Sequence, residues 1–319
     1  MSTSIPKLEA GCGRIASFLH GNSAVLSELS STYPLKLISA RVSSRPDISI
    51  VYILSYGGGL VGGDRTHLNV KVNHQSSLVL LSQGSTKVFT TRLQQKHINS
   101  PLPPIELNTD AGATIQKMDF TVSSKGALYL LPDPVTCFRS ASYKQLQTFH
   151  LAQDATLVLL DWITSGRKSR GEEWSFSRYY SLNEIFLDGF TSRPVRLAKD
   201  GLLLEEEGAE TNGHSSKRSL AQRLAPYSCY ANVVLYGPQI QDVVRELTAA
   251  YEKISVMKLT APPDLLWSLS PITCHGGGRG TIVRVAGKET ELVKDWLREA
   301  LKGLAQVVGV DVYRRAFAQ

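Results

Sequence analysis

A phrase that recurs four times limits what this chain can fold into. Each copy is a short turn segment followed by a brief apolar run, which is typical of a strand that enters a sheet from a tight turn. The spacing between copies is irregular, so the chain lacks the fixed period of a solenoid. The pattern predicts successive strand pairs that stack on similar layers. The four copies are SSLVLLS from Ser76, GATIQKM from Gly112, GALYLLP from Gly126 and DATLVLLDW from Asp154.

Several other segments of the first two thirds of the chain are also predicted strands. Residues 35–42 and the β-branched run at 49–54 have strand composition, and residues 66–72 alternate apolar and polar side chains with period two. Residues 174–187 are predicted to form two short strands. The polar segment 205–219 is predicted to be a mobile insertion, because it has few apolar residues to bury.

Helical periodicity appears beside the strands from about residue 225. NVVLYG and TIVRVAG are predicted strands, and each precedes an amphipathic helix, near residues 240–254 and 292–304. The sequence therefore predicts a mainly β chain of two parts. A β-rich scaffold covers residues 1–224, and a smaller α+β part with two amphipathic helices covers residues 225–319.

Composition and charge narrow the class of protein. The chain has 319 residues, of which 42% are hydrophobic, enough for one large core or two modest ones. The net charge of +7 and the pI of about 9.2 mildly favour an acidic partner. Lys and Arg residues are scattered, and no aromatic side chains interleave with a basic stripe, so nucleic-acid binding is not indicated.

The cysteines and the apolar segments indicate where the protein works. Four well-separated cysteines without a CxxC pair favour a reducing compartment over a disulfide framework. No apolar run has the length of a membrane span, and the N-terminus lacks the apolar core of a signal peptide. The sequence predicts a cytoplasmic protein.

The densest glycine cluster is SYGGGLVGGDR, residues 55–65, with five glycines in seven positions followed by the carboxylate Asp64. A glycine-rich loop after a strand can hold a phosphate. Here Asp64 and Arg65 stand where a P-loop needs Lys and Ser or Thr, and the next segment has strand periodicity where a dinucleotide-binding fold needs a helix. Nucleotide binding is therefore not indicated. A tight turn between strands explains the glycines but not Asp64.

Two further polar segments follow apolar strands. SQGSTKVF offers Lys87, either as a partner for a carboxylate or as an exposed side chain in a turn. LLDWITSGRKSRGEEW places Asp161 inside an apparent buried strand, where a carboxylate must be paired, protonated or metal-bound. Glu172 follows in a glycine-flanked turn, where a solvated side chain is expected. The candidate ionic partners of Asp161 are Arg167, Arg170 and Lys87.

The residue types alone do not define a catalytic or metal centre. No tight cluster of His, Cys and carboxylate residues is present, and the adjacent pair Cys274 and His275 is a weak metal signal. The GxSxG motif of a nucleophilic serine is absent. The spaced carboxylates Asp64, Asp161 and Glu172 are the candidate metal ligands.

Taken in order, the segments SYGGGLVGGDR, SQGSTKVF, LPDPVTCF and LLDWITSGRKSRGEEW resemble the urease accessory protein D family, also called UreD or UreH. The early segment GCGRIASFLHGNSAVLSELSSTYPLKLIS and the C-terminal TIVRVAG with its helix extend the resemblance over nearly the whole chain. The resemblance implies a mostly β fold with β-helix-like stacking of strands, no enzymatic activity and no tightly bound cofactor. It also implies binding to apo-urease and to accessory protein F, which docks the nickel-carrying GTPase accessory protein G. The complex would deliver nickel to the urease active site.

The resemblance also implies which positions matter. It implies an internal nickel route lined by polar and acidic side chains, and weak, exchangeable ligands suit such a route. The 205–219 insertion and the CHGGGRG segment do not match the family pattern. By motif, the candidates for a transient nickel path are Asp64, Asp161 and Glu172, and the other functional candidates are Gly62, Gly63, Thr86 and Lys87.

Two other functions stay open at this stage. A metal-dependent hydrolase using Asp64 and Asp161 would need His ligands nearby, and His67, the closest in sequence, is expected to face solvent. A plain β-rich module that binds an acidic protein rests on charge alone. Co-purification with apo-urease and accessory protein F, without turnover by the isolated chain, separates the first function from these two.

Overall fold

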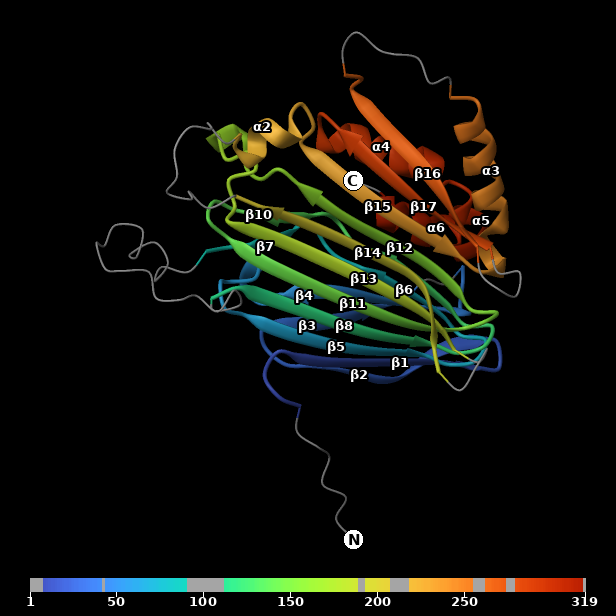
Figure 1. Cartoon of the computed structure of the whole chain (residues 1–319). Coiled ribbons are helices and arrows are strands. Elements are labelled where there is room, and N and C mark those ends of the chain that lie inside the picture. The colour runs from blue at the N-terminus through green and yellow to red at the C-terminus, as the bar shows by residue number, and fades with distance from the viewer. Residues whose placement is uncertain are drawn as a thin grey trace.

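Two β-sheets pack face to face, and C-terminal helices cover the outer face of the larger sheet (Figure 1). This arrangement is seen in a computed structural model, which describes residues 8–41, 44–90, 112–188, 193–206, 218–254, 262–273 and 279–317. The described chain has three layers: a seven-stranded sheet, a ten-stranded sheet and a helical layer. The mainly β class predicted from the sequence is confirmed.

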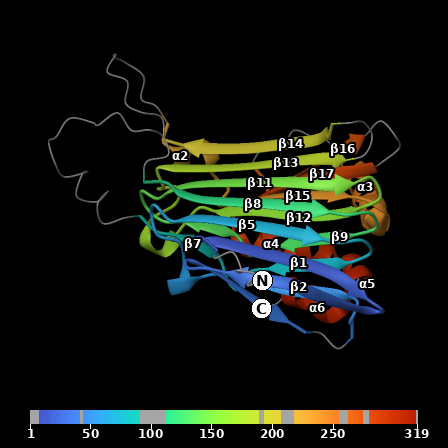
Figure 2. The ribbon, with the colours of Figure 1, turned by 90° about the horizontal axis from the view of Figure 1, so that it is seen from below.

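The seven-stranded sheet is parallel in its middle and antiparallel at both edges. In spatial order its strands are β14 (Val195–Glu205), β13 (Arg178–Asp188), β11 (Ser142–Ala152), β8 (Thr114–Val122), β5 (Arg65–Val72), β1 (Cys12–His20) and β2 (Ser23–Ser31). The edge strands β14 and β2 are the two antiparallel members. One face of this sheet packs on the other sheet, and no element of the described chain covers its opposite face (Figure 2).

The ten-stranded sheet combines parallel strands with an antiparallel extension. Its main path is β16 (Leu265–Thr273), β17 (Arg279–Gly287), β15 (Cys229–Tyr236), β12 (Thr156–Thr164), β9 (Ala127–Leu131), β6 (Ser77–Leu81), β4 (Ile48–Ser55) and β3 (Leu35–Ala40). Two short strands, β7 (Thr86–Val88) and β10 (Val135–Cys137), pair with each other, and β10 pairs with β12. The strands β12, β9, β6 and β4 run parallel. β15 pairs antiparallel with β12, and β17 and β16 continue the sheet, each antiparallel to the strand before it.

The chain winds between the two sheets in successive coils. It passes from β4 to β5, from β6 to β8, from β9 to β11 and from β12 to β13, alternating between sheets. The predicted β-helix-like stacking is therefore confirmed. Three of the four recurring phrases become the neighbouring strands β6, β9 and β12, so that Leu78, Leu128 and Leu157 lie side by side. The fourth phrase becomes β8 in the opposite sheet.

Most predicted elements are present, and one prediction is corrected. Residues 174–187, predicted as two short strands, contain only the long strand β13, because the alternation of buried and half-buried side chains continues unbroken through it. The motif segment LPDPVTCF contains the short strand β10. A further strand, β11, has the sequence SYKQLQTFHLA, whose side chains alternate strictly between buried and half-buried. The stretch of residues 207–217 in the proposed insertion and the pair Cys274 and His275 lie outside the described residues.

The C-terminal helices cover the outer face of the ten-stranded sheet. Their apolar sides pack on strands from both parts of the chain. Val158 of β12 and Val233 of β15, for example, belong to the same core cluster as apolar residues of the helices. None of the described helices is long and apolar enough to cross a membrane. The helices on this face are α3 (Gln241–Glu252), α4 (Thr290–Ala300), α5 (Leu304–Val308) and α6 (Val310–Phe317). The short helix α2 (Leu220–Leu224) instead packs in the cluster that contains Trp174, and the 3-10 turns are η1 (Tyr56–Gly58), η2 (Lys168–Arg170) and η3 (Pro238–Ile240).

Candidate functional site

The motif segments found in the sequence form one continuous layer of the structure. Leu60 of the glycine-rich turn pairs with Val88 of β7, and its N–H donates to the Lys87 carbonyl oxygen at 2.8 Å. β7 pairs with β10, and β10 pairs with β12, which carries Asp161. The glycine-rich turn and Asp161 therefore share a layer but are separated by β7 and β10.

Asp64 closes the turn in which it lies. Its Oδ2 accepts a hydrogen bond from the Val61 N–H at 2.8 Å, and its own N–H donates to the Val61 carbonyl oxygen at 2.9 Å. Gly63 has a φ of +92°, which residues with a Cβ rarely adopt. The carboxylate is partly exposed. These contacts give Asp64 and Gly63 a local structural role in shaping the turn.

Thr86 and Lys87 differ in what they face. Thr86 lines a small internal cavity that Asp161 also lines. The Lys87 side chain is exposed, as one of the two sequence interpretations expected, while its backbone carbonyl holds the glycine-rich turn. Of the two residues, only Thr86 is brought close to the interior.

Glu172 is engaged by arginine. Arg167 donates to both carboxylate oxygens, from Nε at 2.8 Å and from Nη2 at 2.7 Å, and its guanidinium lies 4.1 Å from the centre of the Phe138 ring. Glu172 is only 8% exposed, so the expectation of a solvated side chain is wrong. The Arg167 guanidinium holds the pKa of the Glu172 carboxyl below its usual value. This bidentate ion pair fixes the loop that follows β12.

Asp161 is held by neutral donors from the opposite sheet. Ser181 Oγ donates to its Oδ2 at 2.6 Å, Asn183 Nδ2 to the same oxygen at 2.8 Å, and Gln145 Nε2 to Oδ1 at 3.1 Å. The predicted ionic partners are therefore wrong, since Arg167 binds Glu172. Burial raises the pKa of the Asp161 carboxyl, and the nearby Asp200 carboxylate adds to this, whereas the three hydrogen bonds oppose it.

Asp161 belongs to a polar seam that crosses the interior of the sandwich. On either side of the seam the space between the sheets is filled by apolar clusters, one around Phe149 and Leu159 and one around Tyr179 and Ile163. The seam consists of Asp161, Asn232 and Arg284 from the larger sheet and Gln145, Gln147, Ser181, Asn183 and Asp200 from the smaller one. Burying polar groups costs free energy unless they are hydrogen-bonded, so a core that serves only for stability usually has apolar residues at such positions.

Asp161 lines a cavity on each side of it. The larger, of about 590 Å³, lies between β14 and the strands β15, β17 and β16, and it contains Asp200, Asn232 and Arg284. The smaller, of about 40 Å³, has room for about two water molecules. Its polar lining runs through Gln116, Gln145, Gln147 and Thr86 to the partly exposed Ser82 and Asp133. Asp161 therefore stands between two spaces, each lined by a few polar side chains among apolar ones.

Most residues of the seam were missed by reasoning from sequence. Gln145 and Gln147 lie at the inward positions of β11, and Ser181 and Asn183 at those of β13, where an apolar side chain is usual. Polar residues at inward positions of an alternating strand were the available signal. Asp200 had no such signal, because it lies beside Gly201 on an edge strand.

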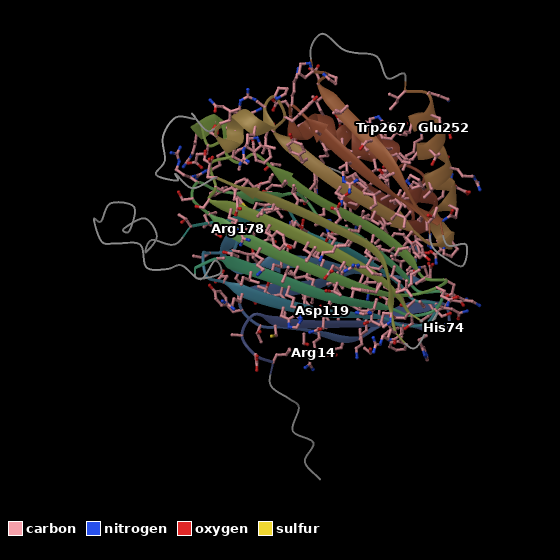
Figure 3. The ribbon with its side chains drawn as sticks, in the orientation of Figure 1. Arg14, His74, Asp119, Arg178, Glu252 and Trp267 are labelled. Carbon is pink, nitrogen blue, oxygen red and sulfur yellow. The ribbon has the colours of Figure 1, made fainter. Side chains whose placement is uncertain are left out.

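The geometry needed for a hydrolase is not found. The cavities lined by Asp161 do not have Asp64 among their lining residues. His67 bonds Asp119 at 2.6 Å on the uncovered face of the seven-stranded sheet, where Figure 3 labels Asp119. Within the described ranges, no group of three or more His, Cys, Asp or Glu side chains could hold a metal ion.

Comparison with known proteins identifies the family. The model of the UreD urease accessory protein family matches residues 10–317. The chain belongs to the UreD family. Urease accessory protein 4 of Cryptococcus neoformans var. grubii is 34% identical over 326 positions, covering 97% of this chain and 96% of that protein. Urease accessory protein D of Arabidopsis thaliana is 31% identical, covering 89% and 92% of the two chains.

A bacterial UreD protein extends the comparison. UreD of Sorangium cellulosum is 31% identical over 96% of this chain and 84% of its own length. The UreD match covers the scaffold and the C-terminal part alike, and the resemblance stated from the sequence motifs is confirmed. All three of these relatives are named urease accessory proteins.

Proposed function

We propose that this chain is a urease maturation factor that binds apo-urease and accessory protein F and, through F, meets the nickel-carrying GTPase accessory protein G. It acts as a scaffold and not as an enzyme. Support comes from membership of the UreD family. It also comes from relatives that are named urease accessory proteins and that this chain matches over nearly their whole length. We expect it to work in the cytoplasm, where free thiols such as those of Cys12, Cys137 and Cys229 stay reduced.

The polar seam supports a second part of this proposal, the passage of nickel through the protein. The single observation that carries it is Asp161, a carboxylate that lines cavities on both sides of it inside a mostly apolar sandwich. A route for an ion needs ligands that bind weakly and exchange, because a closed set of thiolates and imidazoles would retain the nickel. Carboxylate, amide and hydroxyl oxygens with room for water meet that need.

The residues singled out by motif take different places in this proposal. Asp161 is the central ligand of the route, and Thr86 lines the small cavity beside it. For Asp64 and Glu172 a role on the nickel path stays a prediction, since their carboxylates bond the turn and Arg167. Gly62, Gly63 and Lys87 also stay predictions, as parts of the surface around the glycine-rich turn.

The test is urease activation at limiting nickel by cells that carry the Asp161→Ala variant. We expect activation to fall about tenfold or more, the range seen when a group that supports a metal ligand is removed. Pull-down of apo-urease and accessory protein F should remain as for the unchanged chain, because Asp161 faces the interior. Excess nickel should restore part of the activity.

The matched control is Asp264→Ala, which removes a carboxylate that is 77% exposed beside Lys288. This variant should activate urease normally. Full activation of urease by Asp161→Ala at limiting nickel would contradict the proposed passage of nickel through the protein. Failure of the unchanged chain to pull down either apo-urease or accessory protein F would contradict the scaffold role as well.

A further inference from the structure

The strand β14 is the outermost strand of the seven-stranded sheet on the side of the larger cavity (Figure 2). Its residues 198–205 pair in regular antiparallel register with β13. Toward its other side, no backbone group of β14 bonds the backbone of another described element. There the Glu205 carbonyl oxygen accepts a hydrogen bond from Arg223 Nη2 at 2.6 Å. β14 therefore presents a row of backbone donors and acceptors to which a further strand could pair.

The other sheet edges are less open to a further strand. β2 has a bulge where it pairs with β1, and the Ala24 N–H donates to the Pro46 carbonyl oxygen at 2.7 Å. β3 has only six residues. β16 contains Pro271, which has no N–H to donate. Short strands, bulges and prolines discourage pairing at an edge. In β14 the one bulge lies near its start, at Leu197, and residues 198–205 contain neither a bulge nor a proline.

The larger sheet continues beyond β14 and supplies a floor for an added strand. Asp200 of β14 lies over β15 and β17, since it accepts hydrogen bonds from Asn232 at 2.7 Å and from Arg284 at 2.5 Å. β16 lies one strand further out, and no described strand of the seven-stranded sheet extends past β14 to face it. Its inward Leu266 is 53% exposed and lines the larger cavity together with Leu202. A strand added to β14 would therefore bury apolar surface that is open to solvent.

The charges along this edge favour an acidic occupant. Among the described residues β14 takes part in four ion pairs, and in three of them the cation is the more exposed member. Lys199 and Arg196 are 52% and 56% exposed, whereas Glu184, which pairs with both, is 25% exposed. Arg284 is half exposed, and its partner Asp200 is mostly covered. An approaching chain therefore meets ammonium and guanidinium groups before it meets carboxylates.

These charges also argue against a second copy of this chain as the occupant. Pairing of β14 with β14 of another copy would bring Lys199 and Arg196 of both copies to one junction, where like charges repel each other. The fourth ion pair, Arg178 with Glu205, exposes its carboxylate but lies at the end of the strand. An acidic segment would meet the exposed cations with the opposite charge.

We propose that the outer edge of β14 is a β-augmentation site, at which an extended acidic segment of a partner protein adds as a further strand of the seven-stranded sheet. Its backbone pairs with residues 198–205. Side chains of alternate parity point to opposite faces, so its apolar side chains lie on Leu266 and Leu202 while its carboxylates meet Lys199 and Arg196 on the uncovered face. The cations that discourage pairing with a neutral apolar strand thus select the occupant. This site does not depend on the proposed passage of nickel.

The experiment measures binding of a short labelled peptide, in which Val and Glu alternate, to the purified full-length chain by fluorescence anisotropy. We expect the peptide to bind and to protect the amides of β14 from hydrogen exchange. The same peptide with methylated backbone nitrogens should bind about tenfold or more weakly, because main-chain hydrogen bonds supply the affinity of an added strand.

Two variants test the side-chain contacts. Lys199→Glu should weaken binding of the Val–Glu peptide about fivefold and tighten binding of a Val–Lys peptide by a similar factor, a gain that misfolding cannot produce. Leu266→Glu should weaken binding of the Val–Glu peptide about fivefold or more, because it places a carboxylate on the apolar floor. The matched controls are Lys71→Glu, which makes the same charge change on β5, and Leu292→Glu, at a similarly exposed leucine of α4. Both controls should leave the affinity unchanged.

Three results would overturn the proposal. The first is equal affinity for the peptide and its methylated form, and the second is the absence of binding by the Val–Glu peptide. The third is a dimer of this chain in sedimentation whose β14 amides are protected without peptide, which would assign the edge to a second copy. Pull-down of apo-urease and accessory protein F by the unchanged chain would support the scaffold role in each of these cases, so the two proposals fail separately.

Discussion

At the scale of single residues, Asp64 and Asp161 show how similar sequence signals lead to different chemistry. Each follows or interrupts an apolar strand. Asp64 accepts from the N–H three residues before it, so its bond is local and closes a turn. Asp161 accepts hydrogen bonds from side chains of the opposite sheet. Its position is unfavourable for a negative charge, because the carboxyl is buried and the Asp200 carboxylate lies nearby. Of these two carboxylates, only that of Asp161 bonds side chains between the two sheets.

The raised pKa of Asp161 has a consequence for stability. A carboxyl whose pKa is higher in the folded chain than in the unfolded chain binds its proton more tightly when folded, so ionisation costs folding free energy. Asn at this position does not ionise. We expect the free energy of unfolding of the unchanged chain to fall relative to that of Asp161→Asn as the pH rises from about 4 to about 7. Urea denaturation at several pH values measures this difference.

The control variant, Asp47→Asn, should show the opposite pH dependence of stability. Two hydrogen bonds from Arg45 hold the pKa of the Asp47 carboxyl below its usual value, so its contribution is present at neutral pH and is lost as the pH falls through the folded pKa. Relative to Asp47→Asn, the unchanged chain should therefore gain stability as the pH rises. A parallel pH dependence of the unchanged chain and Asp161→Asn would contradict the role given to burial.

At the scale of elements, the glycine-rich turn is shaped by its close approach to β7. A Cβ on Gly59 would lie 2.6 Å from the Lys87 carbonyl oxygen and 2.5 Å from the Phe89 ring, whereas a Cβ on Gly58 would meet nothing within 4 Å. Gly58 is instead required by its φ of +78°. Gly59 is thus needed for close packing, whereas Gly58 is needed for its backbone conformation.

These two purposes predict two different outcomes of substitution. Gly59→Ala should destabilise the protein by roughly 1–3 kcal/mol through overpacking and should speed hydrogen exchange of the Phe89 amide, which donates to the Leu60 carbonyl. Gly58→Ala should cost about 1 kcal/mol from backbone strain and leave that exchange rate unchanged. Equal exchange rates in both variants would show that β7 does not depend on the close approach at Gly59.

At the scale of the whole molecule, the scaffold and the C-terminal part share one sheet and one core. β15 lies between β12 and β17, so the boundary near residue 224 cuts between two paired strands. Leu160 from the scaffold and Leu297 from the C-terminal part belong to the same apolar cluster. The division in sequence pattern at this point marks a change of local structure within a continuous core.

Separating the two parts should therefore prevent folding. A fragment of residues 1–224 would expose the edge of β12 and the apolar residues that α3 and α4 cover, which is unfavourable and promotes aggregation. We expect this fragment to be insoluble or to lack near-ultraviolet circular dichroism when expressed alone, and to be rescued by co-expression with residues 225–319. Cooperative unfolding of the isolated fragment would contradict this expectation.

Local periodicity was sufficient to predict most strands and the class of fold. Residues 66–72 alternate so clearly that the inward Leu68, Val70 and Val72 were assigned correctly, and the recurring apolar phrases did become neighbouring strands. The motif order was also sufficient for the family. By contrast, the ionic partners expected for Asp161 were wrong, because the residues that face it across the sandwich are the neutral donors Gln145, Ser181 and Asn183.

The sequence by itself determined the strand periods, the tight turns, the amphipathic C-terminal helices and the UreD family, since these depend on residues close together in the chain. The tertiary structure alone decided that Asp161 meets Asn183, that Asn232 meets Asp200, and that Asp161 lines two cavities. The physical reason is that a strand's pattern shows which side chains turn inward, whereas the packing of the two sheets selects which of them meet. The polar seam is a product of that packing.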